Sequence, residues 1–110
     1  MKEPKILLEH ILESVSYIQD FIADSSYEDF CKNVEKQDAV QRRFEIIGEA
    51  VKNLPDELKN SHPEIPWRSI ASMRDMLIHE YFEVSLKQVW IAATEDIIVL
   101  KKAVKELLDS

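Results

Sequence analysis

Eight consecutive residues combine the groups that acid–base chemistry on a phosphate needs: Arg74-Asp75-Met76-Leu77-Ile78-His79-Glu80-Tyr81. On a helix, Asp75 and His79 are four residues apart and share a face, so the carboxylate can orient the imidazole. Arg74 and His79 are five residues apart, which is about 140° around a regular helix. Side-chain length, a distorted last turn or a facing copy of the same segment must therefore bring these two groups together.

This set of groups is chemically sufficient to cleave RNA without a metal. The ribose 2′-OH supplies the nucleophile, and a histidine that titrates near neutral pH can move the proton as general base or acid. Arginine presents a fixed, forked cation to the charge that develops on the phosphate oxygens. Asp75, with Glu80 nearby, would raise the pKa of His79. The alternative is structural, with Arg74 and Asp75 as surface charges, His79 at a helix end and Tyr81 packed on the following loop.

The other metal-ligating residue types are scattered along the chain. His10 lies among charged residues of the first predicted helix, and His62 precedes a proline in a connection. Neither has a metal-ligand spacing to a second site, and the single Cys31 adds none. The sequence therefore predicts no metal site, no cofactor and no disulfide.

Composition places these residues in one all-α domain spanning residues 1–110. The 110 residues are 45% hydrophobic and include one glycine and four prolines, which favours helices over a turn-rich β fold. The net charge of -7 argues against bulk, non-specific nucleic-acid binding but leaves room for a local basic site. Charge at Glu9 interrupts any signal-peptide pattern, and no apolar run reaches a membrane-spanning length of roughly 20 residues, so we expect a cytoplasmic protein.

Apolar residues recur at three- and four-residue steps in two stripes of the first half of the chain. The first follows Pro4, which suits a first helical turn, and contains Leu8, Ile11, Val15, Ile18 and Ile22. The second ends at Pro55 and contains Val40, Phe44, Ile47, Val51 and Leu54. Between them, Ser26 and Asp29 form a predicted capping box for a short turn.

The second half predicts two more helices. After a proline-rich connection with one helical turn at residues 56–59, Pro66 opens a helix that carries Ile70, Met73 and Leu77. Ser85 and Gln88 predict a capping box for the last helix, whose continuous stripe is Leu86, Trp90, Ala93, Ile97, Leu100, Val104 and Leu107. The expected architecture is an up-and-down helical bundle with four main helices and short turns.

Several residues outside the stripes also carry predictions. Apolar residues beside the stripes widen the hydrophobic surface and predict a homodimer: Leu7, Leu12, Ile46, Ile91 and Ile98. Gly48 in mid-helix predicts a close helix approach. Trp67 and Trp90 have two interpretations, as core anchors, which we expect, or as base-stacking platforms. Three arginines have two interpretations, as solvated surface charges or as contacts to RNA phosphates: Arg42, Arg43 and Arg68.

The pattern Arg74-x4-His79-x-Tyr81 resembles the signature of HepT-type toxins, small HEPN-domain ribonucleases of prokaryotic toxin–antitoxin pairs. The resemblance extends over nearly the whole chain, in the family's order and approximate spacing. It includes the segments at 37–50 (Gln-Asp-Ala-Val-Gln-Arg-Arg-Phe-Glu-Ile-Ile-Gly-Glu-Ala), 63–68 (Pro-Glu-Ile-Pro-Trp-Arg), 89–90 (Val-Trp) and 94–96 (Thr-Glu-Asp).

This resemblance implies a HEPN-like fold and the toxin of a type II toxin–antitoxin pair. Arg74 and His79 would be the catalytic pair in a cleft between two subunits and would cut RNA without metal. The implied partner is a minimal nucleotidyltransferase of the MntA type, which neutralises the toxin by transferring AMP to Tyr81. Asp75 departs from the family's pattern, since related sequences often carry Asn there, and an extra carboxylate beside a phosphate costs affinity unless it is paired.

A second function remains open at this point. HEPN-like bundles also serve as non-catalytic helical dimers that bind a nucleotidyltransferase or a nucleotide, and a fold does not fix a function. Arg74, His79 and Tyr81 favour the toxin, whereas Asp75 and the acidic composition favour the binding module. An RNA cleavage assay separates the two.

Overall fold

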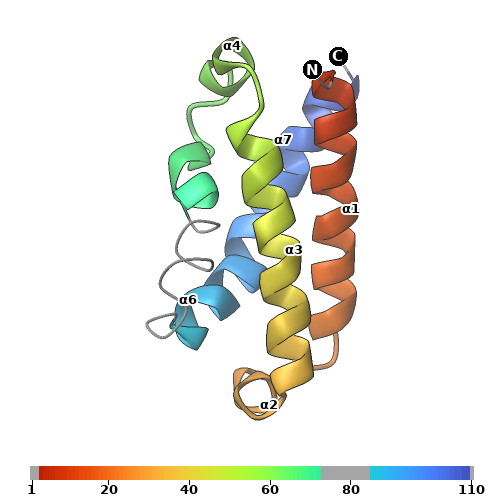
Figure 1. The fold of residues 1–110 in the computed structure, drawn as a ribbon, viewed down its shortest axis with the longest axis vertical. Helices are drawn as coiled ribbons and strands as arrows, with labels where there is room; N and C mark the ends of the chain where they lie inside the picture. Colours follow the sequence, from red (N-terminus) through yellow and green to blue (C-terminus); the bar gives the residue numbers. More distant parts are fainter. Residues whose placement is uncertain (1–2, 73–84, 110) are drawn as a thin grey trace.

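The protein is an all-α bundle in a computed structural model, which describes residues 3–72 and 85–109. In chain order the elements are α1 (Pro4–Ile22), α2 (Tyr27–Lys32), α3 (Val34–Lys52), α4 (Asp56–Asn60), helical residues 67–72, α6 (Leu86–Ile91), the π-helical turn η2 (Ala92–Asp96) and α7 (Ile97–Asp109). The long helices alternate in direction, α1 down, α3 up, residues 67–72 down and α6 to α7 up (Figure 1). The predicted all-α, up-and-down architecture is confirmed.

Local capping explains where the first helices begin and end. Pro4 occupies the first turn of α1, where its missing N–H costs nothing. The Ser26 hydroxyl accepts the backbone N–H of Asp29 at 3.1 Å, and the Asp29 carboxylate accepts the N–H of Ser26 at 3.2 Å. This is the predicted capping box, and it starts α2. Asn33 then caps α3 through a 3.0 Å bond from the N–H of Lys36.

The predicted stripes of α1 and α3 form the centre of one hydrophobic core. The buried members of the two stripes are Leu8, Ile11, Val15, Ile18, Val40, Phe44, Ile47, Val51 and Leu54. Ile22 is only partly buried at the end of α1. Leu7, which the sequence predicted to widen the exposed apolar surface, is instead buried in this core. Gly48 is also buried in mid-helix, consistent with the predicted close approach.

The last predicted helix contains a change of helical form that the sequence pattern did not predict. Residues 92–96 make a π turn, in which the N–H of Ile97 bonds to the carbonyl of Ala92, five residues back. Thr94 lies within this turn, four residues after Trp90, and its hydroxyl donates to the Trp90 carbonyl at 2.8 Å. A π turn leaves a carbonyl outside the regular ladder, and the threonine hydroxyl supplies a donor at this point.

The π turn shifts which residues of this stretch are buried. Val89, in α6 before the turn, is fully buried, and Trp90, predicted as a core anchor, is partly buried against the core with its ring 5.3 Å from that of buried Phe30. Beyond the turn, the predicted positions Ile97, Leu100 and Val104 are buried. The stripe members Leu86 and Leu107 are partly buried against the core, so the predicted stripe is retained, and the π turn brings Val89 and Ala92 into the core beside it.

No helix formed by the described residues combines the length and the apolar character needed to cross a bilayer.

Candidate functional site

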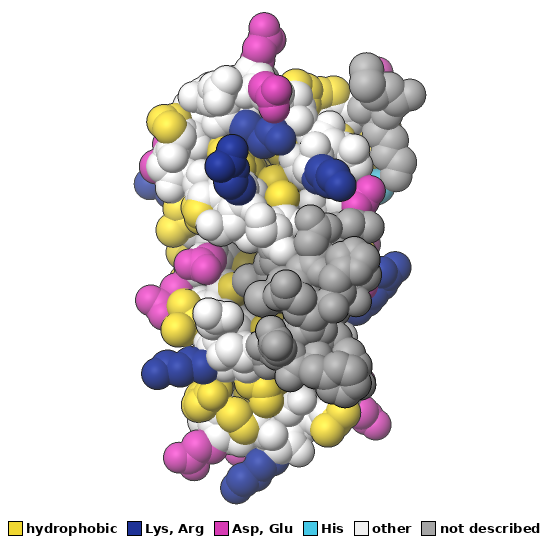
Figure 2. All heavy atoms as spheres, turned by 60° about the vertical axis from the view of Figure 1, so that its left-hand side comes forward, with side chains coloured by type: hydrophobic (Ala, Val, Ile, Leu, Met, Phe, Trp, Pro, Cys, Tyr) yellow, Lys and Arg dark blue, Asp and Glu magenta, His cyan; other side chains and the backbone are white. Residues whose placement is uncertain are grey.

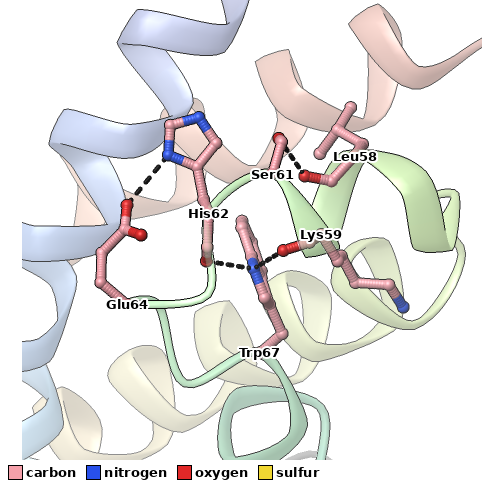
Figure 3. A network of polar contacts seen from close by, with 6 residues as sticks. All are labelled: Leu58, Lys59, Ser61, His62, Glu64 and Trp67. Atoms are coloured by element: carbon pink, nitrogen blue, oxygen red, sulfur yellow. Dashed lines mark hydrogen bonds and ion pairs between the residues drawn. The ribbon is translucent and has the colours of Figure 1, made fainter.

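The structure fixes the start of the helix that leads toward Arg74 through a buried tryptophan. Trp67 is buried, as predicted, and its indole N–H is shared between two carbonyl oxygens, 2.9 Å from that of Lys59 and 3.0 Å from that of His62 (Figure 3). The Ser61 hydroxyl donates to the Leu58 carbonyl at 2.6 Å. These bonds tie the C-terminal end of α4 to residue 67, so the connection before the helix has a defined path.

His62 belongs to this connection and pairs with a carboxylate. Its Nδ1 lies 3.0 Å from Oε1 of Glu64 (Figure 3). The pKa of Glu64 is lowered below its ordinary value, first by a hydrogen bond from its own backbone N–H and then by the bond to His62. The sequence predicted that His62 lies in a loop, and this is confirmed. The pairing of His62 with Glu64, two residues later, was not predicted.

The residues that the sequence predicts to be catalytic are not among those that the structure describes. Arg74, Asp75, His79 and Tyr81 all lie between residues 73 and 84, outside the described ranges. Their predicted roles are therefore not tested by the geometry. Of the nearby candidates, Arg68 is described and is exposed on the helical residues 67–72, six positions before Arg74.

The other two candidate arginines are adjacent in sequence and differ in their surroundings. Arg42 is solvent-exposed, and its Nη1 lies 3.1 Å from Oε2 of Glu45 in an ion pair. Arg43 is half-buried and places its guanidinium carbon 4.1 Å from the ring centre of Tyr17 on α1. The sequence analysis did not predict this contact, because it joins side chains of two helices that are 26 positions apart.

The hollows of the described residues are not shaped to enclose a nucleotide. An apolar cavity of about 40 Å³ is lined by Phe44, Pro66, Ser69, Ile70, Ala92, Asp96, Ile97 and Leu100. It has room for little more than one water molecule. A wide, open depression of about 640 Å³ at the α2–α3 corner is lined by Ser25, Asp29, Lys32, Asn33, Val34, Glu35 and Lys36, whose charges balance.

The surface charge is unevenly distributed despite the net charge of -7. Lys and Arg side chains gather at the end of the molecule where α4 lies, on the side that also carries residues 67–72 (Figure 2). Apolar side chains show in the hollow between them. This arrangement agrees with the expectation that an acidic chain can still present a local basic surface. Among residues 3–72 and 85–109, no three His, Cys, Asp or Glu side chains come together as a metal-binding group.

Comparison with known families connects the chain to RNA chemistry. The family model described as "Ribonuclease HepT-like" matches residues 11–107, which include nearly all of the bundle and the Arg74–Tyr81 segment. The chain belongs to the HepT-like ribonuclease family. The resemblance inferred from the sequence is thereby confirmed, as are the HEPN-like helical fold and the assignment as a ribonuclease with RNA as substrate.

Individual relatives of this HepT-like protein are similar over almost its entire length. A protein of Caldanaerobacter subterraneus subsp. tengcongensis, whose name proposes an RNase, is 46% identical over 98% of this chain and 96% of its own. The "Probable ribonuclease HepT" of Thermococcus cleftensis is 47% identical over 94% of both chains. A protein of Methanocaldococcus jannaschii named as a gamma-glutamylcyclotransferase and proposed RNase is 44% identical, and this chain spans 49% of its length. No solved structure matches.

Proposed function

We propose that this HepT-like ribonuclease is a metal-independent RNA endonuclease and the toxin of a type II toxin–antitoxin pair, with Arg74 and His79 as its catalytic residues. The observation that supports the proposal is the Arg74-x4-His79-x-Tyr81 pattern within the part of the chain that the family model matches. Cellular RNA as the substrate is consistent with a cytoplasmic protein.

In the proposed reaction, the ribose 2′-oxygen attacks the adjacent phosphorus as its proton passes to His79. The bond from phosphorus to the 5′-oxygen breaks, and that oxygen receives the proton that His79 took from the 2′-OH. The products are a 2′,3′-cyclic phosphate and a free 5′-hydroxyl. Arg74 binds the phosphate oxygens as negative charge develops on them. Asp75 accepts a hydrogen bond from the imidazole and favours its protonated form. Exposed Arg68 contacts phosphates outside the reacting one.

An RNA cleavage assay on the purified protein tests these roles. His79→Ala and Arg74→Ala should each lose most of the activity, because a general acid–base group contributes about 10²–10⁴-fold. Both variants should keep the helical circular dichroism of the wild type, and Lys105→Ala, at an exposed position of α7, serves as a control for loss of a surface cation. Cleavage should continue in EDTA. Full activity of His79→Ala, or strict dependence on an added metal ion, would contradict the mechanism.

We also propose that the active protein is a homodimer. The offset of about 140° between Arg74 and His79 on a regular helix suggests that a second copy completes the site. Three large apolar side chains of α6 and α7 are exposed in the single chain, Ile91, Ile98 and Val99, with Ile98 58% exposed. Light scattering at micromolar concentration should give twice the chain mass. A monomer that cleaves RNA would refute this part of the proposal.

The proposed antitoxin is a minimal nucleotidyltransferase of the MntA type that modifies Tyr81. It would transfer AMP from ATP to the phenol oxygen and release pyrophosphate. The new phosphodiester adds negative charge and bulk beside Arg74 and His79, so it should stop RNA cleavage without unfolding the protein. Tyr81→Phe should fold and cleave RNA but resist neutralisation. Mass spectrometry after incubation with the transferase and ATP locates the adenylate, and its attachment at another residue would refute the assignment.

The net charge of -7 favours one other candidate function. A non-catalytic helical dimer that binds a nucleotidyltransferase or a nucleotide needs no surplus of cations, whereas RNA binding does. Asp75 beside Arg74 points in the same direction. This candidate predicts binding to the transferase together with no RNA cleavage by the wild type, so the cleavage assay decides between the two functions.

A further inference from the structure

An aromatic cluster with one arginine lies on the surface where α1 and α3 run side by side (Figure 1). Tyr17 and Phe21, one turn apart on α1, have ring centres 6.2 Å apart and planes inclined by 28°. The guanidinium of Arg43 lies over the Tyr17 ring, with its carbon 4.1 Å from the ring centre. Tyr17 nevertheless remains 42% exposed. A large ring held in a stack and still open to solvent is a surface on which another planar group can stack.

The guanidinium of Arg43 contacts the Tyr17 ring and forms no ion pair with a carboxylate of the described residues. Within residues 3–72 and 85–109, the neighbouring Arg42 forms an ion pair with Glu45, whereas no carboxylate forms one with Arg43. The side chain of Arg43 is half-buried on α3, so its position is held by packing before any ligand arrives. Guanidinium planes and aromatic rings are the two groups on which proteins stack unpaired bases.

We propose that Tyr17, Phe21 and Arg43 form a stacking site for an unpaired base of the RNA substrate. The proposal rests on the family's ribonuclease activity and is independent of the roles of Arg74 and His79. RNA is the expected occupant because this family acts on RNA, and because a planar π-face with an adjacent cation suits a base and its phosphate together.

The charges around the site determine how the strand would lie. On α1, Glu13 and Asp20 are exposed one turn before and one turn after Tyr17. On α3, Arg43 supplies positive charge, whereas the charge of Arg42 is balanced by Glu45. The phosphate of the stacked nucleotide would therefore lie on the α3 side, and the carboxylates of α1 would repel a backbone crossing to their side. The site accordingly holds one nucleotide and makes few phosphate contacts, so its contribution should depend only weakly on salt.

Binding of an uncleavable strand tests the site separately from catalysis. The probe is a fluorescent single-stranded RNA with 2′-O-methyl groups throughout, measured by anisotropy with the full-length protein. Tyr17→Ala should weaken binding about five-fold or more, since stacking on an aromatic side chain is sensitive to alanine substitution. Tyr17→Phe keeps the ring and should bind as the wild type does. Arg43→Lys keeps the charge but not the planar group and should bind more weakly.

Tyr27 provides the matched control. It is 37% exposed and, on α2, its ring lies 6.1 Å from Trp90, away from the Arg43 contact. Tyr27→Ala should change the affinity by less than about two-fold, as expected for a surface substitution outside the site. A strand carrying 5-iodouridine should, on irradiation, cross-link to Tyr17 or Phe21, located by mass spectrometry.

Two outcomes would overturn the proposal. In the first, Tyr17→Ala binds the strand as tightly as the wild type, or the cross-link forms only at other residues. In the second, Tyr17→Ala leaves RNA binding unchanged and converts a dimer into a monomer, which would make the cluster a protein interface. Neither outcome bears on Arg74 and His79, because the probe cannot be cleaved. Conversely, if Arg74 and His79 prove not to be catalytic, Tyr17→Ala should still weaken binding of the uncleavable strand.

Discussion

Ser14 offers an unusual prediction, because replacing it should stabilise the protein. Ser14 lies in the middle of α1 and is only 1% exposed. Among the described residues its Oγ has no hydrogen-bond partner. A buried hydroxyl without a partner costs about 1–3 kcal/mol of folding free energy. Ser14→Ala removes that cost, and alanine also has the higher helix propensity.

The expected magnitude follows from three contributions. Relief of the unpaired hydroxyl contributes about 1–3 kcal/mol, and the small space left behind takes back up to about 1 kcal/mol. Ser16→Ala, at an exposed position of the same helix, measures the propensity difference alone. With about 2 kcal/mol for the hydroxyl, the middle of its range, and at most about 1 kcal/mol for the space, Ser14→Ala should exceed Ser16→Ala by about 1 kcal/mol, which is roughly 4 °C in Tm for a domain of this size.

Urea denaturation and thermal melting at one fixed protein concentration measure the difference, because association would make stability depend on concentration. The m-value should stay unchanged. If Ser14→Ala is less stable than the wild type, or gains no more than Ser16→Ala, the hydroxyl is satisfied in solution by a partner such as a bound water, and the reasoning is wrong.

Two further predictions concern the polar contacts of the described residues. Trp67→Phe and Trp90→Phe remove the same part of the ring, but among the described residues the two-carbonyl hydrogen bond is made by the Trp67 N–H alone. Trp67→Phe should therefore cost about 1–3 kcal/mol more in urea denaturation; equal losses would show that those bonds contribute nothing. The Asp29 pKa is lowered, first by the backbone N–H of Ser26 and then by its hydroxyl, so the stabilisation is present above the ordinary carboxyl pKa and is lost as pH falls through the lowered one. NMR titration should find the Asp29 pKa higher in Ser26→Ala, and an unchanged value would refute the contribution of the hydroxyl.

The sequence predicted the parts of the fold that depend on near neighbours. The stripe through Ile11 and Val15, the capping box of Ser26 and Asp29, and the helical turn after Pro55 each follow from residues within a few positions of one another. These patterns specify a helix and its buried face before any tertiary contact is known, and the structure confirms them.

The features that the sequence did not predict depend on contacts between distant residues. The Arg43–Tyr17 contact requires the packing of α1 against α3, and Leu7 is buried because that packing covers it. Trp67 was expected in the core for its size, but its N–H partners are main-chain carbonyls, whose positions no side-chain pattern specifies. For residues 74–81, spacing alone left a structural and a chemical role open, and the family resemblance is the basis for proposing the chemical one.

The π turn at Ala92–Asp96 affects how the sequences of relatives should be aligned with this chain. Such a turn is what remains when one residue is inserted into a continuous α-helix, because the extra residue is absorbed in a single wider loop of backbone. Deleting one residue there, for example Glu95, would restore an unbroken helix from Leu86 onward. Because the wider loop absorbs the extra residue, the deletion would leave the same face of α6 toward the core. In a relative with one residue fewer at this point, α6 would therefore present the equivalent face to the core, but a gap placed a few positions away would pair residues that are not spatially equivalent.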